Sequence, residues 1–229
     1  MLMYKDLPKY QIDMRRIVTY LVVFIISLSC AAQKIKMMKT NDRFDYEYYK
    51  KKIGKDKIDN QVYKESDSTL VQILISHDEN SVYMIKPMSF VMYIRNYYKH
   101  NNRLKREGCF FLYSSVRVGT WREYDDKGNL IKVIDEDAKF KHLAMRPKDV
   151  LMWMQRQGWI NLSTGEGQQT TFSNTTFDIY FIPRNKHKNK ENTHAKWFIK
   201  KSETYGTEDV VLDAETRELI HHGKTFSIE

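Results

Sequence analysis

The sequence contains only two cysteines among its 229 residues, Cys30 and Cys109. Once Cys30 is removed with an export signal or modified by a lipid, one thiol remains, and one thiol cannot form a disulfide within the chain. The shortage of cysteine therefore excludes a disulfide-stapled scaffold, and the stability has to come from a hydrophobic core. Residues 33–229 are enough to build such a core as one domain or as two small ones.

Motifs that mark enzymes and nucleic-acid readers are also absent. The glycine-containing segment 163–168 lacks the Lys-Ser/Thr end of a phosphate-binding loop. The three consecutive acids 135–137 lack the ligand spacing of a calcium loop, and we interpret them as turn residues in contact with solvent. No aromatic-basic signature of an RNA reader occurs. We therefore expect no enzyme, no cofactor and no nucleic-acid partner.

Histidine and cysteine could supply two further kinds of chemistry. His221 and His222 are adjacent, so on a strand they point to opposite faces and cannot both bind one metal ion. The histidines in and beside the basic loop 183–194 sit among lysines that would repel a cation. Cys109 could act as a nucleophile beside a histidine, but it precedes the apolar run 110–112, and we interpret it as a small buried side chain. The sequence predicts no metal site and no catalytic residue.

One long uncharged stretch is present, and it lies near the N-terminus. Residues 17–28 are apolar, Arg15 and Arg16 precede them, and the small residues 29–32 follow. This order is typical of a secretory signal. The uncharged stretch between Arg16 and Lys34 has 17 residues, at the lower limit of the roughly 17–25 that span a bilayer, so a cleavable signal is favoured over a permanent anchor.

Two processing sites compete at the end of this stretch. Residues 30–32 before Gln33 satisfy the small-x-small rule of signal peptidase. Residues 28–30 resemble the end of a lipoprotein signal, which would make Cys30 the acylated residue. We predict a signal peptide over 1–32 and a soluble mature chain from Gln33, with Cys30 as a candidate lipidation site. The protein is expected in the periplasm, outside the cell, or lipid-anchored to the cell envelope.

Positive charge is in excess. The formal net charge is +9, and residues 1–32 hold four basic and two acidic residues, which leaves +7 for the remainder. A basic surface favours an acidic protein partner or an anionic membrane surface. Residues 33–66 are polar, with charge runs such as 50–52, and predict a mobile N-terminal segment with one helical turn before order begins near Thr69.

The middle of the chain predicts antiparallel strands. Apolar runs at 70–75 and 82–85 flank a polar turn and indicate a hairpin. An internal similarity with a period of 26 residues follows, in which 98–104 aligns with 124–130, and both units have the pattern strand, polar turn, strand. Asn102 and Gly128 occupy matching turn positions that favour a positive φ.

The stretch 118–131, VGTWREYDDKGNLI, resembles the MORN-variant repeats of exported bacterial proteins, and the resemblance covers about 96–134. It implies a β-meander, which we place at 67–140. Such repeats are scaffolds in unrelated settings, so the resemblance carries a fold and little function.

Residues 141–229 predict a helix followed by strands. Pro147 suits a first helical residue and Gly158 a left-handed C-cap, so a helix is expected over 147–157. Val150, Leu151 and Met154 share one face and would pack on a sheet. Strand patterns follow at 177–182, 195–199, 209–212 and 219–220. This order, with Trp197 in the middle strand and 211–216 before a turn, resembles PepSY-type domains, exported modules associated with inhibition of peptidases.

The predicted fold class is therefore α+β, an antiparallel β-meander followed by an α-β-β-β module. The function that fits best is an exported, non-enzymatic protein-binding module, an immunity or inhibitor factor that blocks an effector toxin or peptidase. The alternative is a structural or lipid-surface lipoprotein of the cell envelope, and an unrecognised hydrolase is the third class.

Two sets of residues are predicted to bind the partner. A basic loop could dock on an acidic protein, although it could also be the solvated tip of a hairpin; its residues are Arg184, Lys186, Lys188 and Lys190. The aromatic residues of the repeat, Trp121 and Tyr124, are the second candidate surface.

Overall fold

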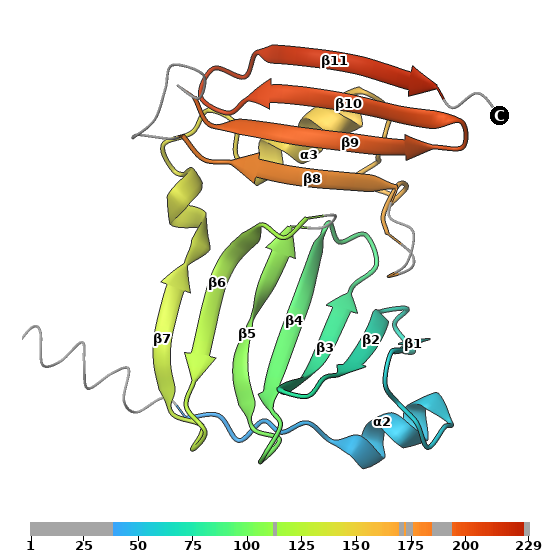
Figure 1. Cartoon of the computed structure of the whole chain (residues 1–229), viewed down its shortest axis with the longest axis vertical. Coiled ribbons are helices and arrows are strands. Elements are labelled where there is room, and N and C mark those ends of the chain that lie inside the picture. The colour runs from blue at the N-terminus through green and yellow to red at the C-terminus, as the bar shows by residue number, and fades with distance from the viewer. Residues whose placement is uncertain (1–38, 112–113, 170–171, 173–175, 185–193, 227–229) are drawn as a thin grey trace, which may run out of the picture.

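The computed structural model describes residues 39–111, 114–169, 172, 176–184 and 194–226. It contains two antiparallel sheets and few helices, which confirms the predicted α+β class. Figure 1 shows the larger sheet below and the smaller sheet above, with a helix behind the smaller one. No helix among the described residues is long and apolar enough to cross a bilayer.

The larger sheet is a meander of seven strands, each hydrogen-bonded to the next in chain order. The strands are β1 (Gln61–Lys64), β2 (Leu70–Ile75), β3 (Glu79–Ile85), β4 (Val91–Tyr98), β5 (Leu104–Phe111), β6 (Arg117–Tyr124) and β7 (Leu130–Asp135). A short 3-10 helix, η1 (Glu136–Phe140), follows β7. The predicted meander and the predicted hairpin at its start are confirmed.

The two repeat units form the hairpins β4–β5 and β6–β7. The predicted turn residues adopt the left-handed conformation, with φ of 57° at Asn102 and 85° at Gly128. The hydroxyl of Tyr98 donates a hydrogen bond of 2.9 Å to the carbonyl oxygen of Tyr124, its equivalent 26 residues later. The sequence period is therefore also a spatial one, because equivalent positions of neighbouring hairpins contact each other.

Residues 39–60 differ from the prediction of a mobile segment. The amide of Thr40 donates to the carbonyl of Gly128 (2.9 Å), and that of Phe44 donates to the carbonyl of Asn102 (2.7 Å). Helix α2 (Tyr46–Ile53) and strand β1 follow, so order begins well before Thr69. The prediction was wrong because polar composition hid two apolar anchors, Phe44 and Ile58, which are both buried.

The smaller sheet has the strand order β11-β10-β9-β8. Its strands are β8 (Phe177–Ile182), β9 (Lys196–Glu203), β10 (Gly206–Asp213) and β11 (Leu219–Phe226), and helix α3 (Pro147–Arg156) precedes them. The predicted α-β-β-β order is confirmed, and Gly158 has the expected positive φ of 70°. Val150 and Met154 are the buried residues of α3, as the helical spacing predicted.

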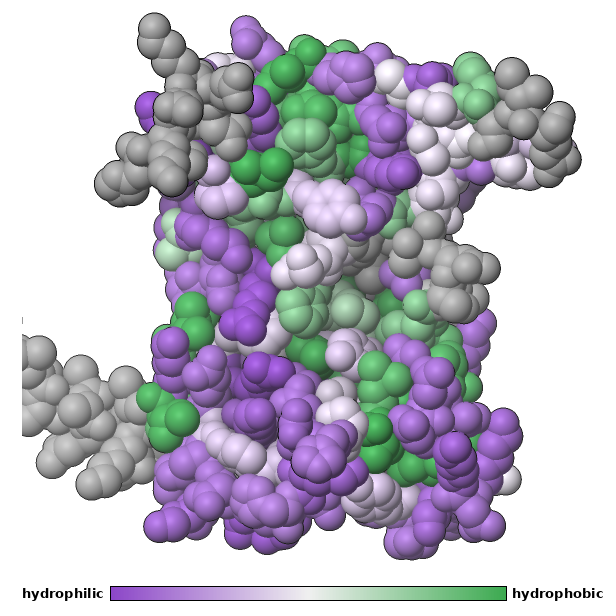
Figure 2. Space-filling model, viewed as in Figure 1, coloured by the Kyte–Doolittle hydropathy of each residue, from purple (hydrophilic) through white to green (hydrophobic). Residues whose placement is uncertain are grey.

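One hydrophobic core joins the two sheets. Leu70, Phe111 and Val118 of the meander pack in the same cluster as Trp197 and Leu212 of the smaller sheet. A second cluster lies between the meander and the segment that contains α2. Figure 2 shows a largely hydrophilic surface around the turns of the meander, whereas apolar residues gather over the smaller sheet.

Candidate functional site

The predicted docking loop is described only at its first residue. Lys186, Lys188 and Lys190 lie outside the described residues, as do the signal segment and Cys30. Arg184 is exposed, and its Nη1 lies 3.6 Å from Oε2 of Glu215. Docking through this loop therefore stays a prediction. One of its four cations, Arg184, already lies beside an acid of the same chain.

The predicted aromatic surface is wrong. Trp121 is 1% exposed and Tyr124 is 7% exposed, so neither can contact a partner on the folded surface. The Trp121 ring fills the space above Gly108, where a Cβ atom would come within 2.3 Å of it. The Arg117 guanidinium lies 4.2 Å from the ring centroid. The alternation of residues along a strand could not predict this burial, because it does not show that Gly108 on the neighbouring strand leaves space for the Trp121 ring.

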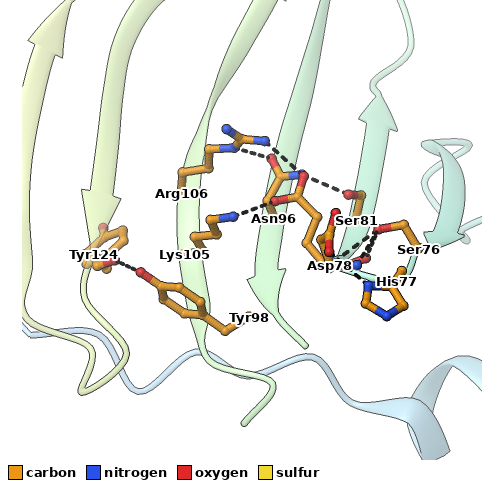
Figure 3. A network of polar contacts seen from close by, with 10 residues as sticks. Ser76, His77, Asp78, Ser81, Asn96, Tyr98, Lys105, Arg106 and Tyr124 are labelled. Carbon is orange, nitrogen blue, oxygen red and sulfur yellow. Dashed lines mark hydrogen bonds and ion pairs between the residues drawn. The ribbon is translucent and has the colours of Figure 1, made fainter. Parts of the chain in front are cut away.

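Polar side chains on the same face as Trp121 form a network around Glu79, and we call this face the network face. The carboxylate of Glu79 accepts hydrogen bonds from Asn96 (2.7 Å), Lys105 (3.0 Å) and Arg106 (2.9 Å). Figure 3 shows these side chains converging from neighbouring strands. Throughout the described part of the chain, no buried side-chain nitrogen or oxygen atom lacks a hydrogen-bond partner. The network therefore ties strands together rather than offering free groups to a ligand.

Two histidines form pairs with acids that the sequence did not predict. His194 Nδ1 lies 2.6 Å from Asp213, and His222 Nε2 lies 2.6 Å from Glu208. Burial raises the pKa of Asp213, but hydrogen bonds from His194 and two backbone amides outweigh it, so the pKa lies below its ordinary value. No group of three or more His, Cys, Asp or Glu side chains within the described ranges could hold a metal ion.

The opposite face of the meander holds an apolar groove. We call it the α3 groove, and it consists of two adjoining hollows of about 580 Å³ and about 440 Å³ that share Val91 and Cys109. Strand pairing puts Tyr93, Cys109 and Val118 in one row on this groove face. Its apolar lining residues are Met84, Val91, Cys109, Phe111, Val118, Phe140, Pro147 and Leu151.

Basic residues surround this apolar floor. The lining contains five cations and a single acid, Asp137; the cations are Lys86, Arg95, Lys141, Arg146 and Lys148. Arg95 lies 3.2 Å from Asp42, and Lys141 lies 2.8 Å from Asp135. Asp137 accepts a hydrogen bond from the amide of Gly119.

Three of the five cations have no acidic partner in the part of the chain that the structure describes. Among the described residues, no carboxylate lies within 4.0 Å of the charged groups of Lys86, Arg146 and Lys148, and all three side chains are exposed. Arg146 and Lys148 flank the first residue of α3. The helix dipole adds positive potential there, although Asp149 caps this helix end through the amide of Arg146. The groove therefore combines an apolar floor with uncompensated positive charge.

The polar end of the groove is fully hydrogen-bonded. The hydroxyls of Tyr93 and Tyr124 both donate to Glu107, and Arg95 lies 3.7 Å from the same carboxylate. Burial and the neighbouring Glu107 raise the pKa of Tyr93 to about 12, as they do for Tyr124. The two hydroxyls keep their protons at neutral pH, and Tyr93 and Arg95 line the smaller hollow.

Cys109 lies at the junction of the two hollows. Burial raises the pKa of its thiol, and the charges of Asp137 and Glu107 raise it further. The thiolate is the reactive form of cysteine, so this environment suppresses nucleophilic chemistry. No histidine is among the residues that line the two hollows.

Sequence reasoning missed this groove. Its cations come from positions 86 to 148, on a strand, loops and a helix end that meet only in the folded chain. No family model, no curated protein and no solved structure matches the chain.

Proposed function

We propose that the protein is an exported, non-enzymatic binding module that holds an acidic, partly apolar segment of another protein in the α3 groove. By occupying that segment it would act as an immunity or inhibitor factor against an effector toxin or peptidase. The observation that carries the proposal is the combination of an apolar floor with three exposed cations that have no acidic partner among the described residues.

The chemistry of the groove favours a peptide that is both apolar and negatively charged. Burial of apolar side chains over Val91, Cys109 and Leu151 would supply most of the free energy, at about 0.8 kcal/mol per CH₂ group. Carboxylates paired with Lys86 and Lys148 would add at most about 1 kcal/mol each, because these cations are exposed. Their main contributions would be specificity and a faster association rate.

A binding role is also supported by the state of the ionisable groups. The raised pKa of Cys109 keeps its thiol protonated at neutral pH. Glu107, which could otherwise serve as a base, is held by two tyrosine hydroxyls and Arg95. Covalent catalysis requires an activated nucleophile and a free base. Cys109 is not activated, and Glu107 is not free.

Cys109 provides a direct test. A synthetic peptide of alternating leucine and glutamate is the probe, and a leucine–lysine peptide of equal length is the control. The acidic peptide should bind by calorimetry and slow the alkylation of Cys109, which lines the groove. The basic peptide should do neither. Equal binding of both peptides, or binding without protection of Cys109, would contradict the proposed site.

Charge reversal sharpens this test. The double substitution Lys86→Glu and Lys148→Glu should weaken binding of the acidic peptide by at least about tenfold, which corresponds to 1.4 kcal/mol. Lys64→Glu is the matched control, because Lys64 is an exposed lysine on β1 that does not line the groove. If both variants bind as tightly as the wild type, the basic rim plays no part.

A second candidate function, a lipid-surface lipoprotein of the cell envelope, is favoured by a different observation. The segment from Lys39 runs along the turn end of the meander to α2, whose last turn carries Lys50, Lys51 and Lys52. Basic residues at that end would face anionic headgroups if Cys30 were acylated. Co-sedimentation with vesicles that contain phosphatidylglycerol should then exceed that with phosphatidylcholine alone, and Lys50→Glu with Lys51→Glu should abolish the difference.

A further inference from the structure

Strand β11 forms an exposed edge of the smaller sheet. Seven of its eight residues are exposed, and Figure 1 shows it at the margin of the molecule, with β10 on its other side. Leu219 and Ile220 near its start are 52% and 49% exposed, and Phe226 at its end is 71% exposed. Large apolar side chains at both ends of an unpaired edge are unusual, because such an edge offers free backbone groups to another strand.

The other edges are shorter than this one. Strand β1 has four residues, and β7 and β8 have six each, whereas β11 has eight. Proteins commonly protect an edge with a proline or with an outward-pointing lysine. Strand β11 contains no proline. It has one β-bulge, at Ile220 opposite Val211 and Leu212, and its single lysine, Lys224, lies 3.4 Å from Glu208. The charge that could repel another strand is thus neutralised within the sheet.

The sequence of β11 is self-complementary about its centre. We infer that two copies of the chain pair antiparallel through β11, with a two-fold axis at Gly223, and so join their smaller sheets into one continuous sheet. In this register Ile220, the extra residue of the β-bulge, falls opposite Phe226 of the second copy on each side of the axis. Apolar ends then meet apolar ends, which is the arrangement that a two-fold interface requires.

The centre of the pair is compatible with this register. Gly223 faces its own copy, so no side chains collide on the axis. His222 faces Lys224 of the second copy, and each copy brings Glu208 beside both of them. In each copy the buried carboxylate of Glu208 therefore balances the charge of Lys224, so the dimer would not place unpaired like charges opposite each other. This inference is independent of the α3 groove, whose lining residues come from the meander, η1 and the first turns of α3 and include none of β11.

Sedimentation velocity over a range of concentrations tests the dimer. The wild type should show a reversible dimer, and the double substitution Ile220→Lys with Phe226→Lys should be monomeric at the same concentrations. Tyr205→Lys is the control, since Tyr205 is 69% exposed but lies in the β9–β10 turn. All three proteins should give the same circular dichroism spectrum, because every substituted residue is exposed. A wild type that is monomeric throughout, or a double variant that still dimerises, would overturn the inference.

Disulfide trapping tests the register separately. In a chain without Cys30 and Cys109, Gly223→Cys should form covalent dimers on mild oxidation, because the two sulfurs would face each other across the axis. A Cβ atom at Gly223 meets only the flexible end of the His221 side chain, so the substitution is tolerable. Thr225→Cys is the matched control, since four residues of offset place its two copies about 14 Å apart. Cross-linking by both variants to the same extent, or by neither, would contradict pairing at Gly223.

Discussion

The two faces of the seven-stranded sheet use charge in opposite ways. On the network face, Glu79 takes hydrogen bonds from Asn96, Lys105 and Arg106. On the groove face, Lys86 and Lys148 stand over apolar residues without an acidic partner in the described chain. Both faces carry more cations than acids, but Lys105 and Arg106 share the Glu79 carboxylate, whereas Lys86 and Lys148 have no carboxylate within 4.0 Å among the described residues. A ligand is recruited by unbalanced charge, so the groove is the better candidate for a functional surface.

The network face should be the more sensitive to substitution. Trp121→Ala removes a ring that is 1% exposed and leaves a cavity over Gly108, which has no side chain of its own to fill it. We expect the free energy of unfolding to fall by about 3–5 kcal/mol. Urea denaturation followed by tyrosine and tryptophan fluorescence measures the loss. Tyr180→Ala, at a residue that is 50% exposed, is the control and should change stability by less than about 0.5 kcal/mol.

The pairing of Asp213 with His194 should make the free energy of unfolding depend on pH. The folded-state pKa of Asp213 is lowered, so its ionised form stabilises the fold above the ordinary carboxyl pKa, and this stabilisation is lost as the pH falls through the folded value. Asp213→Asn should therefore cost about 1–3 kcal/mol at pH 7. The gap between wild type and variant in urea denaturation should narrow at pH 3. A gap that is the same at both values would mean that the pairing with His194 contributes no pH dependence.

The smallest effect on stability is expected at the groove rim. Lys86→Glu with Lys148→Glu removes no contact with an acid inside the described chain, so the unfolding free energy should change by less than about 0.5 kcal/mol. A comparison of the thermal melting curves of the double variant and the wild type is sufficient to measure this change in stability. A loss above 1 kcal/mol would show that these lysines are structural and would remove the contrast between the two faces.

Local patterns in the sequence predicted much of the backbone. The 26-residue period located two hairpins, and the turn positions of Asn102 and Gly128 have the expected positive φ. Pro147 and Gly158 bracket α3 because they act through their own backbone geometry. Such features depend on a few neighbouring residues, so a single sequence is enough to find them.

Features that depend on distant parts of the chain were not predictable in this way. Trp121 looked like a surface aromatic because the hollow that receives it is created by Gly108 on the neighbouring strand. The groove combines a loop residue, Lys86, with the first turn of α3, and no periodicity links the two. The described N-terminal segment looked mobile because Phe44 and Ile58 are isolated among polar residues, although both are buried.

The attachment of that segment constrains the order in which the molecule can assemble. Thr40 and Phe44 hydrogen-bond to the turns at Gly128 and Asn102, and a Cβ atom at Gly128 would come within 2.5 Å of the Thr40 carbonyl oxygen. During synthesis, the segment leaves the ribosome long before those turns exist. Its docking must therefore wait until both hairpins have formed, since contacts of high sequence separation form late. The first described residues of the chain are then among the last to reach their final position, because the carbonyls that accept from Thr40 and Phe44 are in place only when both turns have formed.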